Sequence, residues 1–333
     1  MTPSELLARL DAQPRVVLGE TPTPLQRLER LSAELGRPVL VKRDDLLGPA
    51  LGGNKTRKLE YLMADARRQG ATRVVTFGGL QSNHARLTAA AASLVGMEAH
   101  LLYFEPRPKS LTGNLLLNEL LGARMHFFPL ASKRPRPRSL ESTIRLARLL
   151  ARLRVGPHYF IPVGGHTWVG ALGYVRAAVE IDEQARGLGV ADAHLVVAAG
   201  SGGTLAGLLA GLRLVGSRLQ PLGIDVGKLW KAFPASVAHL ASEVSTRLGE
   251  PQVFAPPGVP LVESTYAGEV YGRPTGAGNA ALERLLRTEG ILLDPVYTAK
   301  AFAGLFGEAA RGRLGPGEPV VFVHTGGLPA LFA

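Results

Sequence analysis

The sequence predicts an α/β protein of two domains, each built on a mostly parallel sheet. Short runs rich in Val, Ile and Leu alternate with amphipathic segments of helical length, which is the pattern of βαβ units. These units form two series that separate near residue 165. With 333 residues, of which 46% are hydrophobic and 20% charged, the chain can fill two cores of ordinary size. We therefore expect a ligand-binding cleft between the two series.

The first series begins with a strand at 38–41 and a loop rich in glycine and polar residues. A helix is expected at 56–68, because apolar side chains recur there on one face, and Gly70 ends it. The remaining elements follow in order: a strand at 73–77, a helix at about 82–95, a strand at 99–103, a helix at 112–121, a strand at 124–128 and an amphipathic helix at 139–154.

The second series begins near Gly170. Its expected elements are a helix at 171–187, a strand at 194–199, a glycine-rich turn at 200–203, a helix at 204–215, a strand at 221–225, helices around 228–247 and 276–288, and a last strand at 319–324. Three polar or glycine-rich motifs, at 78–84, 200–204 and 324–327, directly follow strands. Ligands of such sheets bind beyond the carboxyl ends of the strands.

The chain is basic, with a formal net charge of +11 from 38 Lys and Arg against 27 Asp and Glu. Arginine is concentrated in the stretch 133–154, where no aromatic residue occurs between Phe128 and Tyr159 to stack on bases. Arg145, Arg148 and Arg152 share a helix face away from the apolar one. We predict a solvated helix surface here and no nucleic-acid partner.

Several other classes are excluded or disfavoured. The chain has no cysteine, which excludes disulfides, thiolate metal sites and a cysteine nucleophile. His84 has no second histidine or carboxylate at the spacing of a helical metal motif, so no metal is predicted. The amino-terminal residues do not resemble a signal peptide, and no segment has the length and hydrophobicity of a membrane span. We expect a cytoplasmic protein with no membrane partner.

The glycine-rich turn Gly200–Gly203 suits a phosphate group. Free backbone N–H groups and the dipole of the following helix attract anions, and the hydroxyls of Ser201 and Thr204 add donors. Asp225, after the next strand, lies where a dinucleotide-binding protein carries its ribose-binding acid. The pattern G-x-G-x-x-G is broken, however, because position 205 is Leu205. The residues leave open a mononucleotide, a cofactor monophosphate or a tight turn without a ligand.

Lys55 is the candidate nucleophile. It follows Gly52 and Gly53 at the start of a helix, where helix-end dipoles and a neighbouring cation favour its neutral form. An ordinary solvated lysine is the alternative. The motif Gly78–His84 likewise carries polar side chains at a strand-to-helix turn, where a helix N-cap is the alternative.

Six segments, taken in order, resemble those of one family: GGNKTRKLEYLMADA (52–66), GGLQSNHARLTAAAA (78–92), GSGGT (200–204), YGRPTGAG (271–278), LLDPVYTAKA (292–301) and HTGGLPALF (324–332). This is the 1-aminocyclopropane-1-carboxylate deaminase / D-cysteine desulfhydrase family of pyridoxal-phosphate enzymes. The resemblance implies a tryptophan-synthase-β-like fold (fold type II) of two three-layer α/β domains. The larger domain would comprise 1–56 and 167–333 and the smaller 57–166. A homodimer acting on a small amino acid is also implied.

The resemblance also implies roles for the matching residues. Lys55 would hold the aldehyde of pyridoxal 5'-phosphate and later move the substrate's Cα proton, and Ser82, Tyr271 and Tyr297 complete the catalytic set. Asn83 is expected beside the cofactor's 3-hydroxyl. The other expected cofactor contacts are Ser201, Gly202, Gly203 and Thr204 around the phosphate, together with Thr298 and Thr325. Asn54, Gln81 and Ser82 would face the substrate.

Three positions indicate D-cysteine desulfhydrase and not the deaminase. Deaminases of the family typically have Glu, Leu and Gln where this sequence has Thr298, Thr325 and His84. A carboxylate facing the pyridine nitrogen would strengthen electron withdrawal, whereas a threonine hydroxyl offers only a neutral hydrogen bond. The weaker withdrawal suits elimination of a good leaving group such as a thiolate.

We therefore predict α,β-elimination of D-cysteine to pyruvate, sulfide and ammonia. Within the family, the alternatives are 1-aminocyclopropane-1-carboxylate deamination and cleavage of another β-substituted alanine, such as L-cysteate. From another class, the alternative is a nicotinamide-dependent oxidoreductase using Gly200–Gly203 and Asp225. A nucleic-acid-associated or ligand-binding protein using the arginine stretch is the third alternative.

Overall fold

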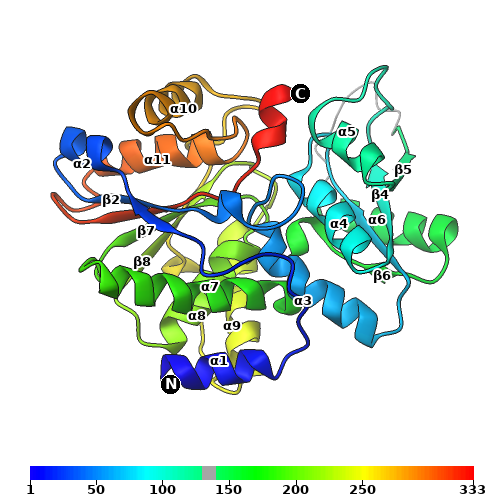
Figure 1. Ribbon diagram of the computed structural model, residues 1–333, viewed down its shortest axis with the longest axis horizontal. Helices are drawn as coiled ribbons and strands as arrows, with labels where there is room; N and C mark the ends of the chain where they lie inside the picture. Colours follow the sequence, from blue (N-terminus) through cyan, green and yellow to red (C-terminus); the bar gives the residue numbers. More distant parts are fainter. Residues whose placement is uncertain (130–139) are drawn as a thin grey trace.

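The computed structural model describes residues 1–129 and 140–333, which form two units, each around its own sheet (Figure 1). The six-stranded sheet has the order β1-β2-β10-β7-β8-β9, and only β1 is antiparallel to its neighbour. Its strands are β1 (Leu25–Arg27), β2 (Val39–Lys42), β7 (His194–Ala199), β8 (Gln220–Asp225), β9 (Leu261–Val262) and β10 (Val320–Val323).

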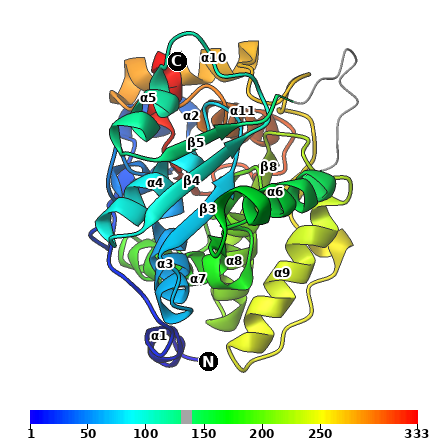
Figure 2. The same ribbon diagram turned by 90° about the vertical axis from the view of Figure 1, so that its right-hand side faces the viewer.

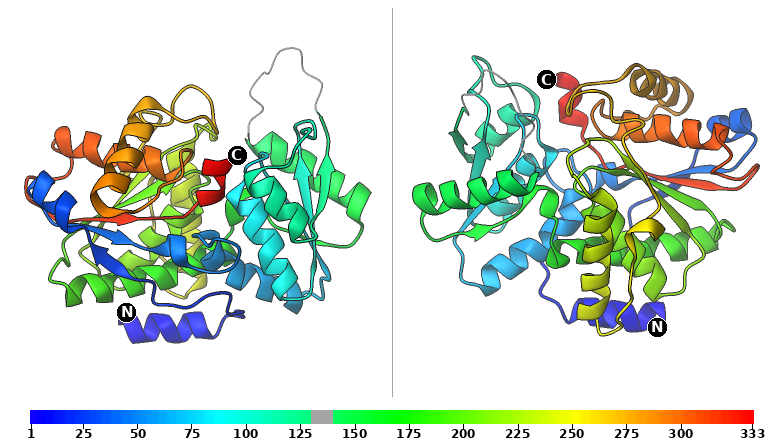
Figure 3. Two further views of the ribbon diagram at one scale, coloured as in Figure 1. Left: turned by 45° about the horizontal axis from the view of Figure 1, so that its top comes forward. Right: turned by 180° about the vertical axis from the view of Figure 1, so that it is seen from behind.

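The second sheet has four parallel strands in the order β5-β4-β3-β6. They are β3 (Arg73–Phe77), β4 (Glu98–Tyr103), β5 (Arg124–Phe127) and β6 (Tyr159–Phe160). We call the part around the six-stranded sheet the large unit and the part around the four-stranded sheet the small unit. Figure 3 shows them side by side, with the carboxyl terminus between them.

Helices cover both faces of the large sheet (Figure 1). On one face lie α1 (Pro3–Asp11), α7 (Trp168–Gly187), α8 (Gly203–Leu214) and α9 (Phe233–Arg247), and on the other α2 (Glu29–Leu35), α10 (Gly276–Glu289) and α11 (Thr298–Ala310). Side chains of β10 alternate between the two cores: Val321 and Val323 enter the first, and Val320 and Phe322 the second. Burial on both faces explains why such strands are continuously apolar.

The small sheet is also a middle layer (Figure 2). Helices α3 (Lys55–Arg68), α4 (Asn83–Leu94) and α5 (Gly113–Leu120) contribute to the core on one face, and α6 (Leu140–Val155) covers the other. Val74 and Val75, adjacent on β3, enter different cores. The expected architecture of two three-layer α/β units is confirmed.

Helix α3 belongs to both units. Its Tyr61 packs in the core of the large unit, whereas Leu59 and Leu62 pack in the core of the small one. The helix is consequently buried along most of its length. Domain boundaries at 57 and 166 stay a prediction, since the structure shows a shared helix at the first of them.

Most expected elements are present with small shifts in their ends, and two deviations have clear causes. Helix α9 begins at Phe233 and not near 228, because Lys228 has a φ of 52°, which a right-handed helix cannot contain. Helix α7 begins at Trp168, three residues early, because the Thr167 hydroxyl accepts from the N–H of Gly170 and caps it. Within residues 1–129 and 140–333, no helix is long and apolar enough to cross a membrane.

A buried network of charges fixes the first turn of α3 to the large unit. Arg57 is 2% exposed and holds Asp44 with two hydrogen bonds of 2.8 and 2.9 Å. The same guanidinium donates to both carboxylate oxygens of Glu180 on α7, each at 2.9 Å. Lys42 also contacts Glu180. Burial alone would raise the pKa of Asp44, but Arg57 and Lys42 outweigh it and hold that pKa below the usual value.

Replacing Asp44 tests how much this network contributes to the free energy of unfolding. Asp44→Asn keeps the shape but leaves a buried guanidinium short of a charge, so the free energy of unfolding should fall by about 3 kcal/mol. Urea denaturation followed by circular dichroism measures it. Asp192→Asn is the matched control, because Asp192 pairs with Arg218 at an exposed site where ion pairs contribute little. Equal effects of the two substitutions would contradict the role of the network.

Candidate active site

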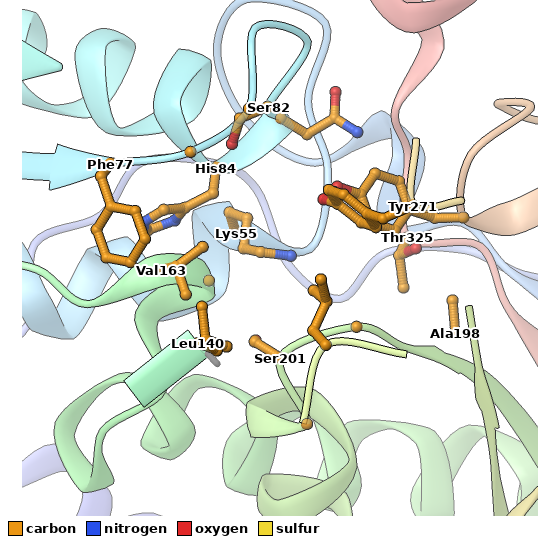
Figure 4. Close-up of a pocket in the computed structure, with 18 of the residues that line it drawn as sticks. Lys55, Phe77, Ser82, His84, Leu140, Val163, Ala198, Ser201, Tyr271 and Thr325 are labelled. Atoms are coloured by element: carbon orange, nitrogen blue, oxygen red, sulfur yellow. The ribbon is translucent and has the colours of Figure 1, made fainter. Parts of the chain in front are cut away.

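A cavity of about 250 Å³ lies between the two units, at the carboxyl ends of strands from both sheets. Figure 4 shows the amine of Lys55 extending into its middle. Ser82 and His84, from the small unit, lie on one side. Ser201, Tyr271 and Thr325, from the large unit, lie on the others. The cavity is thus assembled from segments far apart in the sequence, as the predicted cleft requires.

Most of the predicted site residues line this cavity. They are Asn54, Lys55, Ser82, Asn83, Ser201, Gly202, Thr204, Tyr271, Tyr297 and Thr325. Gln81, Gly203 and Thr298 are not among the lining residues. Gly203 still borders the site, because it begins α8 directly after the glycine-rich turn. The structure shows where these residues lie, and their individual roles stay predictions.

Gln81 and Thr298 make hydrogen bonds within the protein, and their expected roles toward the ligand stay predictions. The Gln81 side chain donates to the Thr112 carbonyl and accepts from the N–H of Asn114, so it holds the start of α5. Thr298 is fully buried, and its hydroxyl donates to Asp294 at 2.7 Å. Asp294 also accepts from three backbone N–H groups, at 296–298, and thereby caps α11.

Lys55 lies in an unusual electrostatic setting. Its amine donates to Asn54 Oδ1 at 2.9 Å. Burial lowers the pKa of Lys55 to about 8, with the positive charge of Arg86 acting in the same direction and the negative charge of Asp294 opposing it. A lysine of this kind is partly neutral near pH 7, as a nucleophile or a base must be.

The glycine-rich turn and α3 form a pocket suited to a phosphate. Gly202 has a φ of 81°, which glycine adopts without strain, and α8 begins directly after it. Lys58, one turn after Lys55, is 1% exposed and donates to the Gly164 carbonyl at 3.0 Å. A Cβ at Gly203 would lie 3.0 Å from Lys58 Nζ, so this amine lies directly beside the first residue of α8. Burial, and then the charge of Lys55, hold the pKa of Lys58 well below its usual value.

Sequence reasoning did not single out Lys58. Its signal was present, because residues three apart share a helix face and Lys55 already marked that face. A buried cation without a carboxylate partner is costly, and an anion bound at the glycine-rich turn would relieve that cost. The residues present therefore fit a phosphorylated ligand.

His84 lines the cavity with a neutral ring. Thr76 donates its hydroxyl proton to the Ile161 carbonyl, so it must accept from His84 Nε2 at 2.9 Å. Burial, with Lys55 and Lys58 nearby, holds the pKa of His84 well below its usual value, so the ring is neutral. Its Nδ1 is buried, and the backbone of Pro162 lies close enough to the ring to raise the His84 pKa slightly against these effects.

Tyr271 and Tyr297 meet at the wall of the cavity opposite the small unit. Their hydroxyls are in direct contact, and their rings pack edge to face. Burial raises the pKa of both hydroxyls above the usual value. Both therefore remain protonated at neutral pH, and because one hydroxyl donates to the other, one proton of the pair is left to donate to a ligand. Glu105, which sequence reasoning also missed, lines the small-unit side, and burial raises its pKa.

Asp225 does not have the geometry of a ribose-binding acid. One carboxylate oxygen accepts from the N–H groups of Gly227 and Lys228, at 2.9 and 3.1 Å, and the other accepts from that of Ser264 at 3.3 Å. Both oxygens thus stabilise turns of the large unit. This removes the residue on which the nicotinamide-dependent alternative relied.

The arginine stretch is only partly within the described residues. Residues 133–138 lie outside them, whereas the helical part forms α6 as expected. Arg148 stacks over the Phe160 ring at 4.8 Å. Across residues 1–129 and 140–333 no group of three or more His, Asp or Glu side chains could hold a metal ion.

Comparison with known proteins gives one consistent result. Residues 16–326 match the family described as pyridoxal-phosphate dependent enzyme. The chain is 41% identical over 327 residues to D-cysteine desulfhydrase of Yersinia enterocolitica, with 96% of each chain covered. It is also 41% identical to D-cysteine desulfhydrase of Serratia proteamaculans, with 98% of each covered. The crystal structure of an ACC deaminase homologue, 39% identical, superposes with a TM-score of 0.86 and covers 98% of this chain and 96% of that one.

The pH dependence of Lys55 labelling tests its electrostatic setting. In protein freed of ligand, reductive methylation of Lys55 should be half-maximal near pH 8, whereas an ordinary lysine has a pKa of 10.5. Only the neutral amine reacts, so labelling falls below that pH. Peptide mass spectrometry measures it. Asp294→Asn should move the midpoint lower, and Asp225→Asn, another buried backbone-capping carboxylate, should not. A midpoint near 10.5 would contradict the depressed pKa.

Proposed function

The chain belongs to the family of pyridoxal-phosphate-dependent enzymes, as its sequence motifs predicted, and we propose that it catalyses α,β-elimination of D-cysteine. D-Cysteine and water would give pyruvate, hydrogen sulfide and ammonia. The C–S bond breaks, the Cα proton is removed, and water later replaces the amino group. The observation that carries this proposal is the amine of Lys55, partly neutral and placed at the centre of a cavity with a phosphate pocket.

The residues around the cavity fit pyridoxal 5'-phosphate. The turn at 200–204 and Lys58 would hold its phosphate, Lys55 its aldehyde carbon, and Asn83 its 3-oxygen. When bound, the cofactor withdraws electrons from the substrate's Cα. The Lys58 amine, which lies beside the turn and has no carboxylate partner among the described residues, supports an anionic ligand at this end of the cavity.

The chain's own groups would orient the substrate and move its protons. Ser82 caps α4 by accepting from the N–H of Ala85 at 3.2 Å, so its hydroxyl lies at the positive end of a helix. That position suits the substrate carboxylate. Lys55 Nζ, once free, would take the Cα proton. The tyrosine pair Tyr271 and Tyr297 would donate its one free hydroxyl proton in a hydrogen bond to the departing sulfur.

Thr325 is the cavity residue that favours a thiol substrate over a cyclopropane. It lines the cavity, and its hydroxyl makes no hydrogen bond with the described residues, so it can bond the cofactor as a neutral group. The hydroxyl of Thr298 donates to Asp294, and its contribution to this choice stays a prediction. Relatives named as D-cysteine desulfhydrases support the same substrate. Deamination of 1-aminocyclopropane-1-carboxylate and cleavage of L-cysteate remain the alternatives.

A homodimer and a cytoplasmic location are also part of the proposal. Both come from the resemblance to the family and from the sequence. Light scattering of the purified protein tests the first: a mass of twice 35.3 kDa is expected, and a monomer would contradict it.

A parallel assay of candidate substrates tests the reaction. D-Cysteine should yield equal amounts of pyruvate and sulfide, with little product from L-cysteine and no 2-oxobutyrate from 1-aminocyclopropane-1-carboxylate. Lys55→Ala should lower turnover by at least about a thousandfold, and Lys109→Ala, at an exposed lysine, should not change it. 2-Oxobutyrate as the main product would contradict the proposed substrate but not the family.

Substitution of Thr325 tests the basis of substrate choice. Thr325→Leu removes one neutral hydrogen bond worth about 1 kcal/mol, so the ratio of D-cysteine to cyclopropane turnover should fall roughly five- to tenfold. Thr298→Glu, outside the cavity, should lower the unfolding temperature and leave this ratio unchanged. Steady-state kinetics of Thr325→Leu and Thr298→Glu with D-cysteine and with 1-aminocyclopropane-1-carboxylate measure this ratio. A ratio that responds only to Thr298→Glu would contradict this assignment.

A further inference from the structure

A chain of hydrogen bonds runs from Arg86 through Asn114 to Asn83. Arg86 Nε donates to Asn114 Oδ1 at 2.7 Å. Asn114 Nδ2 then donates to Asn83 Oδ1 at 3.0 Å and to the carbonyl of Gln81, also at 3.0 Å. Arg86 and Asn114 are both 0% exposed. Only the last member, Asn83, lines the cavity.

The chemistry of the partners allows one direction only. A guanidinium donates hydrogen bonds and never accepts them, so Asn114 must turn its oxygen toward Arg86. A backbone carbonyl only accepts, so the Gln81 carbonyl requires the nitrogen of Asn114 on the other side. Two independent partners therefore fix the same orientation of the Asn114 amide. Asn83 must receive its hydrogen bond on Oδ1, and its Nδ2 is the free end.

Space is kept clear beside that free end. Asn83 Nδ2 makes no hydrogen bond within residues 1–129 and 140–333. A Cβ at Gly327 would lie 2.8 Å from this nitrogen, so a side chain there would collide with it. The relay through Asn114 leaves Asn83 Nδ2 free to donate, and the absence of a side chain at Gly327 leaves space beside this nitrogen.

We propose that Asn114 is a positioning residue whose amide orientation makes Asn83 present an N–H donor, and not a carbonyl acceptor, to the 3-oxygen of the cofactor. This inference rests on the proposed cofactor site and is independent of the substrate. A donor at that oxygen stabilises its deprotonated form. Arg86 is the origin of the relay, and its remaining N–H groups donate to the Ala50 and Gly52 carbonyls in the loop before Lys55.

Asn114→Asp reverses the relay with little change of shape. The new carboxylate still accepts from Arg86, but it cannot donate to Asn83, so the Asn83 amide turns and its oxygen faces the cofactor. The pH titration of the bound cofactor's visible absorbance, recorded without substrate, should then shift upward by about one pH unit or more. The affinity of the cofactor-free protein for pyridoxal phosphate, measured by fluorescence, should fall about tenfold.

Asn118→Asp is the matched control. Asn118 is on the same helix, α5, is also 0% exposed, and donates to the Tyr103 hydroxyl at 2.8 Å within the small unit. The control carries the same buried charge change away from the cavity, and its titration should match that of the unchanged protein. Thermal unfolding of both variants separates a loss of stability from a change at the cofactor.

The outcomes are decisive in either direction. The relay would be overturned if the pH midpoint of the cofactor absorbance in Asn114→Asp equalled that of the unchanged protein, or if Asn114→Asp and Asn118→Asp shifted it equally. If Asn114→Asp does not fold, Asn114→Leu takes its place. This variant removes the donor and the acceptor of residue 114 together, so Asn83 is free to turn and the titration midpoint should again rise. A midpoint equal to that of the unchanged protein would overturn the proposal. Because no substrate is present, failure of the relay and failure of the D-cysteine assignment are distinguishable.

Discussion

The position of α3 between the two units is the constraint on which the site depends. The helix buries opposite faces in two cores, so it cannot rotate without disrupting both. The ion network around Arg57 then fixes its first turn against β2 and α7. Lys55 precedes Arg57 by two residues, and its amine is thereby placed at the centre of the cavity (Figure 4). This placement of Lys55 needs no mobile loop.

The same arrangement creates an excess of buried positive charge. Arg57 has carboxylate partners, but Lys58 and Arg86 are bonded to carbonyl or amide oxygens. Burial and these cations lower the pKa of the lysines in the site, and only Asp294 opposes the shift at Lys55. A ligand with a phosphate would neutralise what the protein leaves unpaired.

The fold was predictable because its signal is local. Periodic burial identified most strands and helices, and glycine motifs after strands identified the cavity edge. Helix α11 was not expected, because its first turn follows Asp294 and Pro295 and resembles a loop. Thr298, beside Tyr297 in the motif, begins this helix, and its hydroxyl donates to Asp294. Periodicity predicts which helices and strands form, but it does not predict the hydrogen-bond partner of a hydroxyl group.

Residues that act through a neighbour are the hardest to find from sequence. Asn114 and Asn118 are the same residue type, one helical turn apart and equally buried, and nothing in the pattern separates them. One meets Asn83 and the other meets Tyr103 only because β3, β4 and α4 bring those partners to different levels of α5. The polarity that Asn83 shows to the cavity follows from a guanidinium that can only donate. Whether Asn83 offers a donor or an acceptor to the cavity is therefore decided outside the cavity, by the direction of the hydrogen bonds that Arg86 and Asn114 make in the core.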